Sequence, residues 1–181
     1  YHRTRDPQVL NMVETSLDHM ARGGIYDHLG GGFHRYSTDP FWLVPHFEKM
    51  LYDNALLSRL YLNAYQISGN PFYSSIAQET LDYVLREMKD PQGGFYSTQD
   101  ADSEGEEGKS FVWTPGEIEK IVGSRDAAVL QNYFGVTHEG NFEGRSILFR
   151  PRDASQVAQE LSLEPAELLA IVERGRAALL E

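Results

Sequence analysis

Cysteine is missing from the 181-residue sequence, so the chain itself forms no disulfide, thiolate metal site or cysteine nucleophile. Long apolar runs are missing too. No segment approaches the roughly 18 apolar residues of a membrane helix, and the first residues lack the apolar stretch of a signal peptide. We therefore expect a cytoplasmic protein without a membrane partner.

Positive charge is scarce, because 16 Lys and Arg residues stand against 27 Asp and Glu residues, a net charge of -11. Such a balance disfavours binding to a phosphate backbone, so no nucleic-acid partner is expected. Hydrophobic residues make up 41% of the chain, which suffices for one core. The sequence begins without Met and ends inside a helical pattern, so we expect a piece of a longer polypeptide.

Apolar residues recur at helical spacing in several segments, many of which open with a cap residue or a proline. Asp6 and Pro7 open the first segment, and Asn70 and Pro71 open the third. The expected helices span residues 7–22, 45–68, 71–89, 117–122, 127–134, 154–161 and 165–180. Short strands are expected at residues 33–37, 95–98, 110–114 and 146–149. The fold class is therefore mainly α.

A weak internal repeat relates two helix ends, Gly23-Gly24-Ile25-Tyr26 and Gly93-Gly94-Phe95-Tyr96. Each pair of glycines ends a helix and begins a loop with short strands. Helices that alternate with long loops at corresponding ends indicate a toroid or solenoid, whose loops converge on one face. The alternative is that glycine and aromatic residues merely form unrelated hairpins.

The segment from Trp42 to Asn54 concentrates ionisable side chains at the beginning of the expected helix from Pro45. Helical geometry would place His46, Lys49 and Asp53 on one face and Glu48 on another, about 200° from His46. A shared ligand would thus require a distorted first turn. The alternative is a Lys49–Asp53 salt bridge with Glu48 near the positive end of the helix.

The second group is an acidic loop with five carboxylates between Asp100 and Glu107. Its opening matches the first six positions of a calcium-binding EF-hand loop, but the twelfth position, which needs a bidentate Glu, is Phe111. A solvated acidic turn is the alternative. Four aromatic residues on the expected flanking strands would form a wall beside the acids, suited to a sugar-like ring. These are Phe95, Tyr96, Phe111 and Trp113.

A third group surrounds Gly30-Gly31-Gly32, which no lysine follows as it would in a phosphate-binding P-loop. His34 and Arg35 would point to opposite faces of a strand, so at most one of them faces a pocket. A buried, hydrogen-bonded structural role is the alternative for either histidine in this group.

Three stretches together, residues 24–37, 42–54 and 95–113, resemble the spermatogenesis-associated, thioredoxin-like family in content and order. The resemblance covers residues 1–150. It implies a thioredoxin-like domain, absent from this chain, followed by a six-hairpin toroid similar to N-acylglucosamine 2-epimerases and related glycosidases. Residues 1–181 would be a single partial domain, about the first half of an (α/α)6 toroid with short β-hairpins in its loops.

The resemblance also implies a pocket, because the family's motifs fall on residues 34–36, 46–54 and 100–105. At Phe111 the family usually has tyrosine, so a hydroxyl is absent here. The candidate catalytic residues are His46, Glu48, Asp53, Asp100 and Asp102. The candidate substrate-binding residues are His34, Arg35, Tyr36, Trp42, Lys49, Phe95, Glu104 and Trp113.

The expected function is that of a carbohydrate-active enzyme of epimerase or isomerase type, with a histidine near its ordinary pKa exchanging a proton. A glycosidase is a second chemistry for the same fold. A non-catalytic module that binds a ligand or docks the thioredoxin-like domain is the alternative. No cofactor or metal is expected, and the expected partners are a sugar-like small molecule and the remainder of the polypeptide.

The end of the chain gives one further expectation. A toroid cut midway would leave the apolar residues of the last helices, from Ala154 to Glu181, without partners. The sequence therefore predicts either self-association through this end or coverage of it by the remainder of the polypeptide, present as a separate or cleaved chain.

Overall fold

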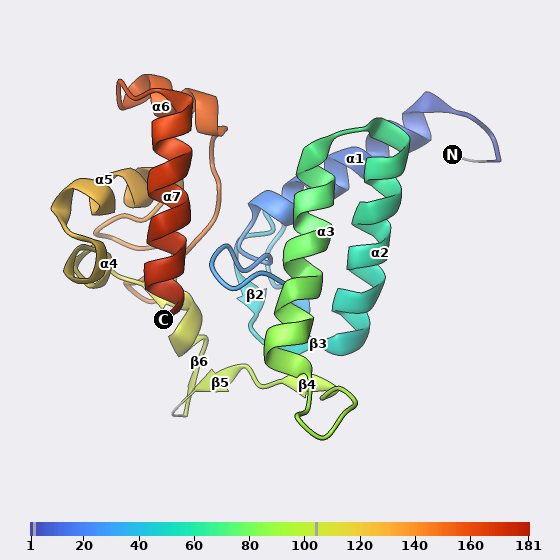
Figure 1. Ribbon diagram of the computed structural model, residues 1–181, viewed down its shortest axis with the longest axis horizontal. Helices are drawn as coiled ribbons and strands as arrows, with labels where there is room; N and C mark the ends of the chain where they lie inside the picture. Colours follow the sequence, from blue (N-terminus) through green and yellow to red (C-terminus); the bar gives the residue numbers. More distant parts are fainter. Residues whose placement is uncertain (2, 104) are drawn as a thin grey trace. The chain divides into compact units, whose positions relative to one another are not determined.

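The computed structural model describes residue 1, residues 3–103 and residues 105–181. The chain forms two compact units (Figure 1): the first comprises residues 1–26 and 31–100, and the second comprises residues 27–30 and 101–181. Within the described residues, seven α-helices and four two-stranded sheets make the fold mainly helical, as expected. No helix in this part of the chain has the length and apolar character required to cross a bilayer.

Three helices build the first unit: α1 (Pro7–Arg22), α2 (Leu51–Ser68) and α3 (Pro71–Tyr83), which a π-helical turn, η1 (Val84–Met88), extends. In Figure 1, α2 and α3 run side by side in opposite directions. Aromatic rings fill the core between the helices and the loop after α1, and those of Phe33 and Tyr61 stack with centroids 5.4 Å apart. Such rings bury large apolar areas and thereby stabilise the unit.

The expected caps begin these helices. The Asp6 carboxylate accepts a hydrogen bond from the Gln8 amide at 2.9 Å, and the Asn70 side chain accepts one from the Phe72 amide at 3.1 Å. Each satisfies a backbone donor that the first helical turn leaves without a partner. The predicted starts at Pro7 and Pro71 are confirmed.

Two small antiparallel sheets accompany the helices of the first unit. Strand β1 (Tyr36–Ser37) pairs with β2 (Pro45–His46), and β3 (Lys49–Met50) pairs with β4 (Thr98–Gln99). The second pairing joins residues about fifty positions apart, and the Leu51 amide extends it with a bond to the Ser97 carbonyl at 2.9 Å. These ladders fix the chain that leads into α2.

The second unit is built around α7 (Pro165–Leu180), which packs against α4 (Pro115–Val122), α5 (Ser124–Tyr133) and α6 (Ala154–Glu160). Thr114 and Glu117 form the expected capping box at the beginning of α4. The remaining elements are a 3-10 turn, η2 (Lys109–Phe111), and two strand pairs. The pairs are β5 (Asp102–Ser103) with β6 (Glu106–Glu107), and β7 (Val112–Trp113) with β8 (Ser146–Ile147).

The expected helix from Pro45 is wrong in its first six residues, because α2 begins only at Leu51. Proline and apolar spacing are local signals that a helix start shares with other structures. Here pairing with β1 and β4 satisfies the backbone of residues 45–50 instead, and Met50 is extended with φ -98° and ψ 138°. The helical-face arguments for His46, Glu48 and Lys49 therefore do not apply.

The expected wall of four aromatic residues is also wrong in its pairing. The strands that follow Phe95 and Phe111 do not pair with each other, because β4 pairs with β3 and β7 pairs with β8. The acidic loop between them forms its own hairpin from β5 and β6.

Four apolar residues of the last helix are buried, whereas Leu169 and Leu180 are 45% and 47% exposed. Leu168, Ile171, Val172 and Leu179 are at most 7% exposed and belong to the core of the second unit. The unit closes on α7 because α4, α5 and α6 surround it. Self-association through this end stays a prediction.

Gly32 lies where the glycine-rich loop closely approaches α3. Its φ is +80°, and a Cβ there would lie 2.4 Å from Cδ1 of Tyr83. Gly94, with φ +85°, has open space around its position. We predict that Gly32→Ala lowers the free energy of unfolding by about 2–4 kcal/mol, from strain plus overpacking, and that Gly94→Ala costs only about 1 kcal/mol. Urea denaturation measures both; equal losses would show that packing against Tyr83 is unimportant.

Candidate functional site

The candidate site lies in the first unit, where the strands bring side chains from three segments together. Tyr36 and His46 are cross-strand partners in the β1–β2 pair. The ladder continues beyond these strands, because the Arg35 amide donates to the Glu48 carbonyl at 2.8 Å. Three segments therefore lie close together: residues 35–36, residues 46–48 and the first turn of α2. We term these segments and Thr98 of β4 the Arg35–Glu48 cluster.

The Glu48 carboxylate is held by two donors. Nη1 of Arg35 lies 3.0 Å from Oε2, and the Thr98 hydroxyl donates to Oε1 at 3.0 Å. The Glu48 side chain is 22% exposed and that of Arg35 is 43% exposed. A hydrogen bond with Tyr52 and the charge of Glu48 both raise the pKa of Arg35. The ion pair is thus partly screened by solvent, and it orients the carboxylate more than it stabilises the fold.

Asp53 has a different environment from Glu48. It lies in the first turn of α2, is half-buried, and its Oδ2 is buried without a hydrogen-bond partner among the described residues. Burial raises the pKa of Asp53; the charge of Arg35 opposes this shift, and that of Glu48 adds to it. A carboxyl that loses water without gaining a donor favours its protonated form. The cluster therefore contains two acids in unlike surroundings.

His46 lies edge-on to Tyr36, with ring centroids 5.2 Å apart. Its Nδ1 accepts a hydrogen bond from the Glu48 amide at 3.4 Å. An accepting Nδ1 places the proton of the neutral ring on Nε2. The ring thus borders the cluster in a defined tautomer.

His34 and Lys49 lie in the interior of the unit. His34 is 2% exposed and its Nδ1 bonds to the Phe47 carbonyl at 2.8 Å. Lys49 is 1% exposed; its ammonium donates to the Gly31 carbonyl at 3.0 Å and lies 4.3 Å from the centre of the Tyr83 ring. Both side chains hold the loop of residues 30–34 in place, and a direct ligand contact for either stays a prediction.

The acidic residues of the loop are divided between the units. Asp100 is an exposed residue of the first unit, whereas Asp102 is an exposed residue of the second and a cross-strand partner of Glu107. Glu104 lies outside the described residues. No group of three or more His, Asp or Glu side chains in the described part of the chain is arranged to hold a metal ion.

The candidate aromatic residues are also separated. Phe95 is 49% exposed in the first unit. Trp42 adopts φ +62° in the turn between β1 and β2 and packs against the core of that unit. Trp113 belongs to β7 in the second unit. Their roles toward a ligand remain predictions.

Comparison with known proteins gives the family. No protein-family model matches the chain. Mouse spermatogenesis-associated protein 20 is 39% identical over 189 residues, a match that covers 91% of the chain. The chain is homologous to a segment of spermatogenesis-associated protein 20. The human protein of that name is 47% identical over 145 residues, and an uncharacterized protein of Caenorhabditis elegans is 34% identical over 145 residues, each match covering 72% of the chain.

The chain spans only part of these relatives, from 18% of the human protein to 24% of the mouse spermatogenesis-associated protein 20. The family resemblance found in the sequence is confirmed.

Sequence reasoning missed Thr98, and it included Tyr52 and Asn54 only as members of the family motif of residues 46–54. Tyr52 raises the pKa of Arg35, Thr98 binds Glu48, and Asn54 bonds to both backbone groups of Phe33. Asn54 follows Asp53 directly and is fully buried. The family motif of residues 46–54 was the signal that included Asn54; its burial makes its partners necessary, because a buried amide requires hydrogen bonds.

The raised pKa of Asp53 predicts a pH-dependent effect of Asp53→Asn. The folded protein protonates this carboxyl more readily than the unfolded chain, whose ordinary value is 3.8. The ionised form therefore lowers stability as the pH rises through the folded pKa. We expect Asp53→Asn to be more stable than the wild type at about pH 7, with the gain vanishing below pH 3.8.

Urea unfolding across this pH range measures the gain. Asp82→Asn, at an exposed position of α3, is the matched control and should show no gain at either end. A wild type more stable than Asp53→Asn at neutral pH would mean that the carboxylate is stabilised by its surroundings.

Proposed function

We propose that the chain is a segment of a carbohydrate-active (α/α)6 toroid, and that the Arg35–Glu48 cluster binds a sugar-like ligand and exchanges a proton with it, as in an epimerase or isomerase. The proposal rests on one observation: the cluster contains two acidic side chains, Asp53 and Glu48, in different environments. Asp53 has a buried oxygen without a donor and a raised pKa, while Glu48 is held by Arg35 and Thr98.

In a proton transfer, one of the two acids would be the proton donor and the other the proton acceptor. Burial raises the pKa of Asp53, which favours it as the proton donor, and Arg35 and Thr98 orient the Glu48 carboxylate, to which we assign the role of acceptor. His46 supplies an Nε2–H donor beside them, given the bond at its Nδ1. Tyr36, 48% exposed, offers a ring against which the apolar face of a sugar packs.

The toroid part of the proposal is supported by the surface of the first unit. Four leucines on α2, α3 and η1 are between 40% and 67% exposed: Leu56, Leu60, Leu81 and Leu85. Leu56 and Leu60 are one helical turn apart, as are Leu81 and Leu85, so each pair lies on one face of its helix. The two pairs form apolar stripes that further helices would cover. The second half of the toroid and a thioredoxin-like domain, in the remainder of a longer polypeptide, are the partners we propose.

Solvent deuterium exchange tests the catalytic claim directly. The chain is incubated in D2O with a panel of aldoses, ketoses and N-acyl amino sugars, and proton NMR follows loss of the carbon-bound hydrogen next to the carbonyl. We expect exchange with at least one sugar, and a loss of about 100-fold or more in Glu48→Gln and in Asp53→Asn. Glu87→Gln and Asp82→Asn, both exposed in the same unit, should retain the wild-type rate.

Two other results would redirect the proposal. Saturable shifts at Tyr52 and Thr98 without exchange would favour the non-catalytic module. Hydrolysis of a disaccharide without exchange would favour a glycosidase, which needs its two carboxyl groups about 5 Å or 6.5–9.5 Å apart. A chain that neither binds nor transforms any sugar would contradict the carbohydrate claim.

A further inference from the structure

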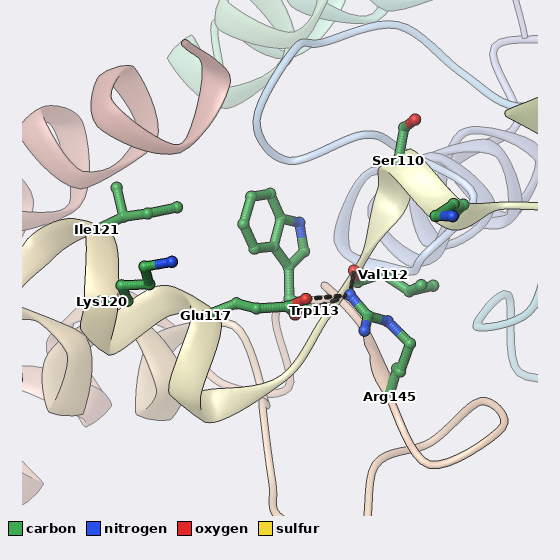
Figure 2. Close-up of a pocket in the computed structure, with 8 residues that line it drawn as sticks. Ser110, Val112, Trp113, Glu117, Lys120, Ile121 and Arg145 are labelled. Carbon is green, nitrogen blue, oxygen red and sulfur yellow. Dashed lines mark hydrogen bonds and ion pairs between the residues drawn. The ribbon is translucent and has the colours of Figure 1, made fainter. Parts of the chain in front are cut away.

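The second unit contains a groove that is independent of the Arg35–Glu48 cluster. It has a volume of about 450 Å³ and lies between β7, α4 and the loop before β8. Its lining residues are Lys109, Ser110, Val112, Trp113, Glu117, Lys120, Ile121 and Arg145. This volume is within the range of small-molecule sites in proteins. Figure 2 shows the indole ring of Trp113 rising beside Lys120 and Ile121 of α4.

The apolar part of the groove suits a flat or branched apolar group. The indole ring is half-buried, and Val112 and the 47% exposed Ile121 lie beside it in the lining. Nε1 of Trp113 is buried and has no hydrogen-bond partner among the described residues. Because this nitrogen is buried, a ligand in the groove contacts the apolar part of the ring rather than this atom.

The charges of the groove favour a single negative charge on the ligand. Arg145 and Glu117 neutralise each other through contacts of 2.7 and 2.9 Å, marked in Figure 2. Burial acts to raise the pKa of Glu117, but hydrogen bonds from Thr114 and the ion pair with Arg145 together outweigh it and lower this pKa below its usual range. Lys109 lies 3.6 Å from Glu106. Lys120 is exposed, and within the described residues its ammonium has no ion pair or hydrogen bond.

A neighbouring cavity limits the charge that the groove accepts. It has a volume of about 600 Å³, shares Lys109, Val112, Glu117 and Arg145 with the groove, and adds three carboxylates. These belong to Glu106, Glu107 and Glu143. These carboxylates repel a doubly charged group such as phosphate more strongly than a monoanion, because the repulsion grows with the charge of the ligand.

We propose that this groove binds a small organic monocarboxylate with an apolar ring or branched body. The body packs on Trp113 and Ile121, and the carboxylate pairs with the Lys120 ammonium. Because all the residues belong to the second unit, this site is distinct from the proposed carbohydrate site and does not depend on it.

Phenylacetate is a suitable probe, with neutral phenylacetamide as its isosteric control. The sequence has two tryptophans, so a ¹H–¹⁵N spectrum shows two indole signals, and Trp113→Phe identifies the one in the groove. We expect phenylacetate to shift the Trp113 signal saturably with a Kd below about 1 mM, and phenylacetamide to bind at least about tenfold more weakly. Inorganic phosphate should leave the signal unchanged.

Lys120→Met should weaken phenylacetate binding at least about tenfold, and Lys120→Arg should restore it, because the charge is what the carboxylate recognises. Lys89→Met, at an exposed lysine of the first unit, is the matched control and should bind as the wild type does. Thermal melts confirm that the variants fold. No saturable shift, equal binding of phenylacetamide, or an unchanged affinity in Lys120→Met would each overturn the proposal.

Discussion

The side-chain amide of Asn54 joins the glycine-rich loop to the beginning of α2, and the geometry of the first unit depends on this junction. Its Oδ1 accepts from the Phe33 amide at 2.7 Å, and its Nδ2 donates to the carbonyls of Phe33 and Met50 at 3.0 and 2.9 Å. Asn54 is fully buried, so each of these bonds replaces water that is not available there. The junction places Arg35 and Tyr36, which follow Phe33, beside Glu48 and the first turn of α2.

A second constraint is the close approach of this loop to α3. Gly31 and Gly32 adopt φ near +80° and contact Glu79 and Tyr83, where no Cβ would fit. The buried ammonium of Lys49 then reaches the Gly31 carbonyl and the Tyr83 ring. A charge so deeply buried requires such partners, because its transfer from water is costly. These contacts between the loop backbone, the Lys49 ammonium and the Tyr83 ring stabilise the interior of the unit that carries Glu48 and Asp53.

The sequence was informative wherever a local signal decided the structure. The caps at Asp6 and Asn70 predicted helix starts correctly, because a cap satisfies donors within three residues of itself. It misled where distant pairing decided the structure: residues 45–50 pair with segments near residues 36 and 98 and so do not form a helix. Asp53 and Glu48 were found by residue type, but their unlike environments depend on burial and on Thr98, which no local pattern reveals.

Amide hydrogen exchange in Asn54→Ala tests the dependence of the site on this junction most directly. If Asn54 holds the loop, exchange at Phe33 and Arg35 should become at least about tenfold faster after correction for overall stability, while amides of α5 and α7 in the second unit keep their rates. Asn63→Ala, at an exposed position of α2, should change none of them. Unchanged protection at Arg35 in a folded Asn54→Ala variant would contradict the account, because the pairing of Arg35 with Glu48 would then not depend on Asn54.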